Sequence, residues 1–168
     1  MFTIRKNVFE TNSSSTHSIC ISKEKPVEKK EVVVRLGEYG WENNCYDVLD
    51  YFYTAVCLYK REEELEKILK AMGIKLTVIN PNAKAMNDYY IDHYEGLKEF
   101  IDAALNNVDL LLRILFSGGD VYTGNDNEDC GDAMCRVAEG EYYDNDNECY
   151  VPHPSYNTEK YDYFYKGN

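Results

Sequence analysis

Residues 46–79, YDVLDYFYTAVCLYKREEELEKILKAMGIKLTVI, contain two helical patterns followed by a strand-like one. Over residues 46–59 the apolar side chains recur at the spacing of a helix that buries one face. Asn43 or Asn44 is a suitable N-cap, because a short polar side chain bonds the first free N–H groups of a helix. These features predict a helix over residues 46–59.

The charged run at residues 61–73 predicts a second helix. Acidic and basic side chains lie four residues apart along it, a spacing that stabilises helices, and Gly73 is a residue type that commonly ends them. Residues 74–79 have the apolar and β-branched composition of a strand, and Asn80-Pro81 is expected to end it. Two helices and a strand in this span indicate a fold of the α+β class.

Further elements are predicted on both sides of this span. Alternating apolar residues predict strands over residues 2–9, 18–22 and 31–41. Helical spacing predicts helices over residues 91–105 and 108–116, and residues 82–90 are expected to form a loop. More strands are expected near residues 120–124, 134–137, 141–143 and 161–165, the last as an edge strand.

We therefore expect one α+β domain over residues 1–168. Residues 1–116 are predicted to form its core scaffold. In that scaffold the N-terminal strands and residues 74–79 make a small, mostly antiparallel sheet, and two to four helices pack on it. Residues 117–168 are predicted to form an acidic, tyrosine-rich extension of the same domain, irregular to β-rich in structure.

The chain has a formal net charge of −12, and this charge is unevenly distributed. Residues 1–85 have a net charge of +1, whereas residues 86–168 have −13 and contain eleven of the sixteen tyrosines. Direct binding of nucleic acid or of anionic membranes is not expected, because both need a positive surface. The asymmetry indicates either an interaction surface or a solvated face that maintains solubility.

The sequence predicts a cytoplasmic protein. The opening MFTIRKNVFE lacks the apolar core of a signal peptide, and no apolar run approaches the ~20 residues that span a bilayer. The six cysteines are therefore expected to be thiols or metal ligands.

Residues 117–150 contain ten carboxylates and one basic residue, Arg136. Regularly spaced carboxylates on a folded surface can imitate the phosphates of nucleic acid, which recur every ~3.4 Å along a strand. Tyrosines add packing area at protein interfaces. The residues predicted to bind a partner are Asp120, Asp126, Glu128, Asp129, Asp144, Asp146 and Glu148, with Tyr142 and Tyr143 as anchors.

Three cysteines and a histidine in the acidic half have a spacing related to that of zinc sites. Cys130, Cys135, Cys149 and His153 form C-x4-C-x13-C-x3-H, which provides two pairs of the S and N ligands that zinc prefers. Bound zinc would explain how such a polar segment folds. The alternative is ordinary thiols, because the first spacing is loose for a zinc site and the second is short.

Residues 10–18, ETNSSSTHS, are rich in hydroxyl side chains, which bond to nearby backbone and favour a turn. The same stretch contains Ser13 and His17, the residue types of a nucleophile and its base. The glycines of a phosphate-binding loop are absent from it. We favour the structural turn.

Residues 5–19, RKNVFETNSSSTHSI, and residues 121–129, VYTGNDNED, carry a resemblance to known proteins. They resemble uncharacterised phage and mobile-element proteins of Gram-positive bacteria. The resemblance implies a mobile-element origin and an anti-defence, anti-CRISPR-like role, and it assigns no catalytic residue.

We therefore predict a non-enzymatic inhibitor that acts in the host bacterial cell. It would bind a nucleic-acid-processing defence enzyme, a CRISPR effector nuclease or a restriction enzyme, through an acidic surface that mimics nucleic acid. One alternative is an enzyme that processes a nucleotide or phosphate ester, with the Ser13–His17 turn and a metal on the aspartates. A further alternative is an accessory structural phage protein. The inhibitor needs no cofactor, although zinc fits the cysteine pattern.

Overall fold

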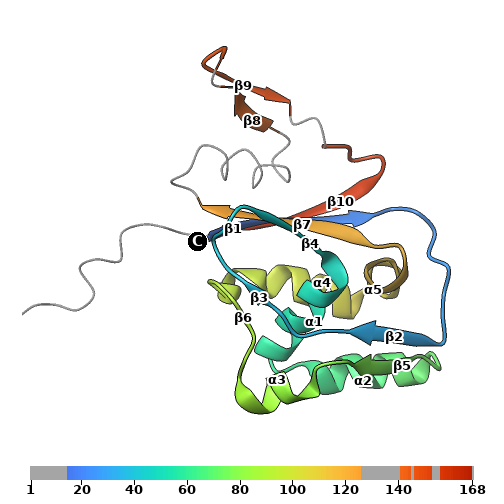
Figure 1. The fold of residues 1–168 in the computed structure, drawn as a ribbon. Coiled ribbons are helices and arrows are strands. Elements are labelled where there is room, and N and C mark those ends of the chain that lie inside the picture. The colour runs from blue at the N-terminus through green and yellow to red at the C-terminus, as the bar shows by residue number, and fades with distance from the viewer. Residues whose placement is uncertain (1–14, 126–140, 145, 153–155, 168) are drawn as a thin grey trace, which may run out of the picture.

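The structure, a computed structural model, describes residues 15–125, 141–144, 146–152 and 156–167. Within these residues the chain has an α+β fold, as its sequence predicts. Helices cover one face of a four-stranded sheet (Figure 1). A hairpin of β8 (Glu141–Asp144) and β9 (Cys149–Pro152) stands on the other side of that sheet.

The four-stranded sheet is antiparallel throughout and has the strand order β10-β1-β7-β4. Its strands are β1 (Ser15–Ser22), β4 (Asn44–Asp47), β7 (Gly119–Asn125) and β10 (Tyr161–Lys166). All eight residues of β1 are buried. The strand predicted over residues 18–22 is confirmed, but it begins at Ser15. The turn predicted over residues 10–18 is therefore wrong for Ser15–His17, because pairing with two neighbouring strands satisfies the backbone and overrides the local preference for a turn. Residues 10–14 lie outside the described ranges.

Two parallel strand pairs lie apart from this sheet. They are β2 (Glu31–Val34) with β5 (Lys75–Val78), and β3 (Glu38–Tyr39) with β6 (Tyr90–Ile91). The strand at residues 74–79 is confirmed, but its predicted place in the antiparallel sheet is wrong, because a helical crossover connects β2 to β5 and such connections give parallel pairing. The strand predicted over residues 31–41 is divided, since the Asn80 side chain bonds both backbone groups of Leu36.

The helices are α1 (Val48–Leu58), α2 (Glu62–Ala71), α3 (Pro81–Met86), α4 (Lys98–Asn106) and α5 (Val108–Phe116), with a 3₁₀ helix, η1, at Tyr94–Leu97. Helix α1 begins two residues later than predicted and is capped by Asp47, whose carboxylate accepts from the Leu49 N–H at 2.8 Å. Residues 91–97 are not part of α4, because His93 has a left-handed backbone (φ 49°) that interrupts a helix. Residues 81–86 form α3 instead of a loop, with Pro81 in the first helical turn.

Helix α1 lies at the centre of the hydrophobic core, between the sheet and the other helices (Figure 1). Tyr51, Phe52 and Val56 on this helix are fully buried. The structure confirms the helix over residues 108–116 and the strands near 120–124, 141–143 and 161–165. The strands predicted at residues 2–9 and 134–137 lie outside the described part. Among the helices that are described, none has the length and apolar character needed to cross a membrane.

Candidate partner-binding surface

Alternate side chains of the four-stranded sheet point to opposite faces. On β1, Ile19 and Ile21 pack in the core, so Cys20 points to the face away from the helices, which we name the outer face. The antiparallel register places Asp120 of β7 and Tyr163 of β10 opposite Cys20. The predicted residue Asp120 therefore belongs to the outer face.

Tyrosines cover much of the outer face. Tyr156 stacks on Tyr163 with ring centroids 4.8 Å apart, and Tyr161 lies edge-on to Tyr163 at 6.1 Å. The hydroxyl of Tyr163 accepts a hydrogen bond from the Asn157 N–H at 2.7 Å. Because these rings are held in place before any contact, a partner that packs on them would lose little side-chain entropy.

Neutral thiols and phenols surround the carboxylate of Asp120. Burial, and secondly the charge of Asp120, raise the pKa of Cys20 to about 12. The same two causes raise the pKa of Cys45 and bring the pKa of Tyr122 to about 12. These thiols are therefore protonated at neutral pH and are poor nucleophiles. On the outer face the carboxylate of Asp120 lies within an aromatic surface, and the register places Asp47 of β4 directly opposite it.

The tip of the β8–β9 hairpin carries three of the predicted acidic residues. The carboxylate of Asp144 accepts hydrogen bonds from the side-chain amide of Asn147 at 2.6 Å and the N–H of Asp146 at 2.9 Å. These bonds lower the pKa of Asp144. Asp146 and Glu148 are exposed, and Glu148 closes the turn with a left-handed backbone (φ 50°). The tip is thus fixed by its own hydrogen bonds, with carboxylates facing solvent.

The candidate acidic residues of this side that the structure describes are all without an ion pair. Asp120, Asp144, Asp146 and Glu148 form no ion pair with any described residue. On the helical side, Glu31, Glu62, Glu64, Asp102 and Asp109 pair with Lys or Arg, whereas Glu63, Glu66 and Glu99 have no ion pair within the described part of the chain. Negative charge is therefore left uncompensated on the side of the sheet where the hairpin stands (Figure 1).

The remaining predicted residues are placed in part. Tyr142 and Tyr143 lie on β8, opposite Val151 and Tyr150 of β9. Asp126, Glu128 and Asp129 lie outside the described residues, and so do the predicted zinc ligands Cys130, Cys135 and His153. The fourth zinc ligand, Cys149, is exposed on β9. Within the described ranges, no three His, Cys, Asp or Glu side chains are grouped as a metal site requires.

His17 is an interior residue. Its Nε2 lies 3.0 Å from the carbonyl oxygen of Gly40, and its Nδ1 lies 2.7 Å from the Tyr51 hydroxyl. Burial, and secondly the nearby charge of Lys166, lower the pKa of His17 to about 3. A neutral imidazole with both nitrogens bonded and no solvent exposure joins β1 to the core. Ser13, its predicted partner, lies outside the described residues.

The charge composition of the sequence identifies Asp120 as a candidate partner-binding residue. It does not identify the side chains that surround Asp120. Cys45, Tyr122 and Tyr161 join it on the outer face through strand pairing. The alternation of Tyr161, Tyr163 and Tyr165 in the sequence is the signal that they share a face. Which strand they pair with depends on contacts far apart in the chain.

Comparisons with protein-family models, with curated protein sequences and with solved structures found no match to this chain.

Proposed function

We propose that this protein is a mobile-element-encoded, non-enzymatic inhibitor of a host nucleic-acid-processing defence enzyme. It binds that enzyme through the outer face and the tip of the β8–β9 hairpin. The observation that carries the proposal is that unpaired carboxylates and packed tyrosine rings occupy the same side of the four-stranded sheet. Asp120, Asp144, Asp146 and Glu148 form no ion pair with any described residue, and on the same side Tyr156 is stacked on Tyr163.

Uncompensated carboxylates have a direct physical consequence for partner choice. They repel nucleic acid and attract a basic channel, and the attraction accelerates association. Once the protein is seated, its carboxylates occupy positions that phosphates would take, so nucleic acid is excluded by charge and by volume. The stacked Tyr156 and Tyr163 supply the packing area that charge pairs at an interface rim do not.

Two observations support this class of target enzyme. A basic channel wide enough for nucleic acid is the surface most complementary to an acidic, aromatic protein. The resemblance of residues 5–19 and 121–129 to phage and mobile-element proteins favours a defence enzyme, such as a CRISPR effector nuclease or a restriction enzyme.

The test is a pull-down with the tagged full-length protein from a lysate of a Gram-positive host, at low and at raised salt, with bound proteins identified by mass spectrometry. The test variant reverses the hairpin tip: Asp144→Lys, Asp146→Lys and Glu148→Lys. The matched control reverses three exposed acidic residues that have no ion pair and lie on helices α2 and α4: Glu63→Lys, Glu66→Lys and Glu99→Lys. Each reversal adds two positive charges, so both variants have the same net charge.

We expect wild type and control to retain a nuclease or other nucleic-acid-binding enzyme at low salt and to lose it as salt rises. The hairpin variant should lose it at every salt concentration, and the captured enzyme should be inhibited by wild type. Equal capture by both triple variants would contradict the proposal, and so would a captured enzyme whose activity is unchanged.

A further inference from the structure

Strand β2 has one edge without a neighbouring strand. In the parallel pair, the Lys75 N–H donates to the Lys30 carbonyl at 2.8 Å and the Ile79 N–H donates to the Val34 carbonyl at 3.0 Å. Because backbone groups alternate in direction along a strand, those of Glu31 and Val33 face away from β5. Within the described residues, neither forms a hydrogen bond on that side.

At the end of this edge, a side chain accepts the hydrogen bond of the next backbone N–H. The N–H of Arg35, which points the same way as that of Val33, donates to the Asp50 carboxylate at 2.8 Å. An acidic group thus already satisfies the next donor along the same edge. The donors and acceptors of Glu31 and Val33 are left to solvent or to a partner.

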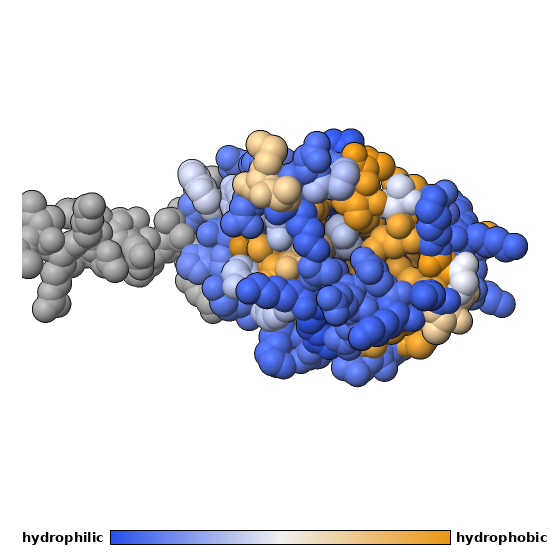
Figure 2. Space-filling model, turned by 90° about the horizontal axis from the view of Figure 1, so that it is seen from below, coloured by the Kyte–Doolittle hydropathy of each residue, from blue (hydrophilic) through white to orange (hydrophobic). Residues whose placement is uncertain are grey.

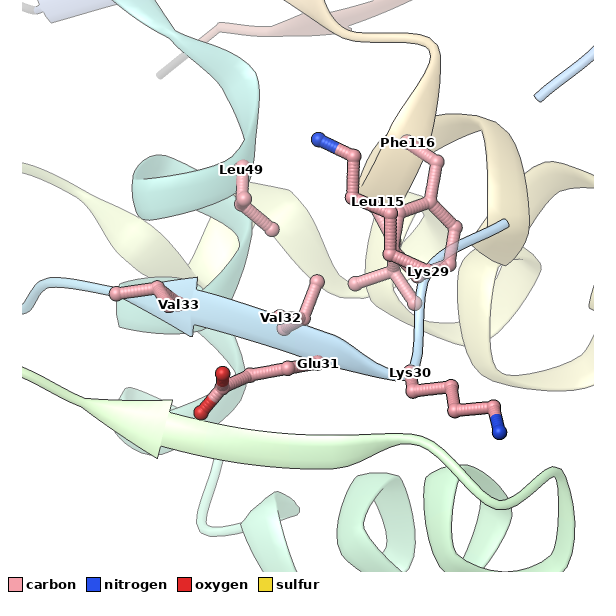
Figure 3. Close-up of a pocket in the computed structure, with 8 residues that line it drawn as sticks. All are labelled: Lys29, Lys30, Glu31, Val32, Val33, Leu49, Leu115 and Phe116. Atoms are coloured by element: carbon pink, nitrogen blue, oxygen red, sulfur yellow. The ribbon is translucent and has the colours of Figure 1, made fainter. Parts of the chain in front are cut away.

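An apolar groove of about 570 Å³ runs beside the open edge. Figure 3 shows Leu49 from α1 and Leu115 and Phe116 from α5 facing it across from Val32. No residue of β5 lines it, so the groove lies on the unpaired side of β2. Seen from the side of α2 and β5, the mostly hydrophilic surface carries a cluster of apolar residues (Figure 2), and Val33 is 48% exposed.

The charges at the groove are positive, in contrast to the chain as a whole. Lys29 and Lys30 are exposed, and Figure 3 shows the Lys29 side chain rising past Leu115 with its ammonium at the mouth of the groove. The Glu31 carboxylate is turned toward β5, where Thr77 donates to it at 2.6 Å and Lys75 lies at 3.3 Å. The groove mouth therefore favours an acidic ligand.

We infer that the open edge of β2 binds an extended peptide segment whose alternate, groove-facing residues are apolar and end in an acidic residue. The peptide backbone adds as a strand to Glu31 and Val33. Because side chains of a strand alternate in direction, one set enters the groove against Leu49, Leu115 and Phe116. The last side chain of this groove-facing set is a carboxylate, which lies near Lys29. This site is on the opposite side of the molecule from the β8–β9 hairpin (Figure 1), so it is independent of the proposed inhibition.

The test measures fluorescence anisotropy of a short labelled peptide, titrated with the full-length protein, that has leucine at alternate positions, aspartate at the last of these positions and serine between them. A peptide with lysine in place of aspartate is the charge control. Val33→Pro removes the free N–H and leaves the ladder bonds to β5, because that N–H faces away from β5. Val33→Thr keeps the N–H and is its matched control. Lys29→Glu tests the charge, with exposed Lys67→Glu on α2 as control.

We expect saturable binding of the acidic peptide, weakened about fivefold or more by Val33→Pro and by Lys29→Glu, with both control variants close to wild type. Circular dichroism should show that all variants are folded. The inference is overturned if the acidic peptide does not bind, if the lysine peptide binds equally well, or if Val33→Pro binds like Val33→Thr. It is also overturned if sedimentation shows that the edge is occupied by a second copy of the chain.

Discussion

The Nδ1 of His17 on β1 and the phenolic oxygen of Tyr51 on α1 lie 2.7 Å apart, and both side chains are fully buried. The opposite ring nitrogen of His17 contacts the Gly40 carbonyl, which only accepts hydrogen bonds. Nε2 therefore carries the hydrogen, and Nδ1 accepts from the Tyr51 hydroxyl. Burial lowers the pKa of His17 to about 3 and raises that of Tyr51, so the pair is neutral.

This pair predicts acid-sensitive stability. The pKa of His17 is about 3 in the fold and about 6.5 in the unfolded chain, so between these pH values only the unfolded chain binds the proton. The contribution of His17 to the free energy of unfolding is fully present above pH ~6.5. It decreases by roughly 1.4 kcal/mol per pH unit as the pH falls toward 3. Urea unfolding at a series of pH values measures the slope.

A comparison of two histidine variants isolates the effect from that of titrating carboxylates. In His17→Gln the slope of the unfolding free energy against pH should be smaller than in wild type. The difference should correspond to the uptake of about one proton on unfolding. His93→Gln, at a residue whose side chain is 55% exposed, should keep the wild-type slope. An unchanged slope in His17→Gln would show that His17 is protonated in the fold.

A second prediction concerns the ion pair that joins α5 to β10. Arg113 has a side chain only 11% exposed and lies 2.7 Å from Asp162 on β10 and 3.0 Å from Asp109 on its own helix. Asp162→Asn leaves a nearly buried guanidinium without its better-shielded partner, so we expect a loss of about 1–3 kcal/mol in unfolding free energy.

Asp109→Asn is the matched control for this ion pair. It makes the same chemical change at a carboxylate that is 76% exposed, where water screens the charge, and should cost less than about 1 kcal/mol. Chemical denaturation of both variants provides the comparison. If both variants lost the same unfolding free energy, the burial of the two carboxylates would not determine how strongly each one stabilises Arg113.

Helices were predictable from the sequence wherever their signals were local. The apolar spacing of residues 108–116 and the glycine after α2 define α5 and the end of α2 without reference to the rest of the chain. Ser15–His17 show the opposite case. Their hydroxyl-rich segment favours a turn locally, but pairing with β7 and β10, more than a hundred residues away in sequence, makes them part of a central strand.

The candidate surface was predictable in its charge and not in its arrangement. Asp120 stands out because its segment is acidic, but its neighbours Cys45 and Tyr163 come from strands distant in the chain. The strand order β10-β1-β7-β4 places them together on the outer face. Sequence periodicity defines a strand's faces without defining its neighbours.

A third prediction tests the close approach of β7 to β1. A Cβ added to Gly119 would lie 2.1 Å from the carbonyl oxygen of Cys20 and 3.1 Å from the Cα of Ile21, both backbone atoms of a central strand. Gly119→Ala must therefore separate the two strands, and we expect a loss of more than about 2 kcal/mol or failure to fold. Thermal unfolding followed by circular dichroism measures it.

Gly167→Ala is the control for this substitution. Its added Cβ would meet the Tyr165 ring at 3.4 Å, an ordinary contact, so the melting temperature should change little. If Gly119→Ala had the same melting temperature as Gly167→Ala, the close approach of β7 to β1 at Gly119 would be wrong.

The last prediction concerns the order in which thiols react with iodoacetamide. Cys149 and Cys45 are exposed, whereas Cys20 and Cys57 are buried, with pKa values raised by desolvation to about 12 and about 11. Since the thiolate is the nucleophile, labelling of the four described thiols at about pH 8 should be fastest at Cys149 and slower at Cys45. It should be nearly absent at the two buried thiols until the chain unfolds. Peptide-mapped mass spectrometry gives each rate.

The same experiment tests the cause assigned to Cys45 and the zinc hypothesis. The charge of Asp120 contributes to raising the pKa of Cys45, so Asp120→Asn should accelerate its labelling, whereas Asp88→Asn, on the helical side, should not. If Cys149 instead binds zinc, its labelling should be slow and should accelerate when a chelator is added, because a coordinated thiolate is protected. Fast labelling of Cys149 that a chelator does not change would exclude it as a zinc ligand.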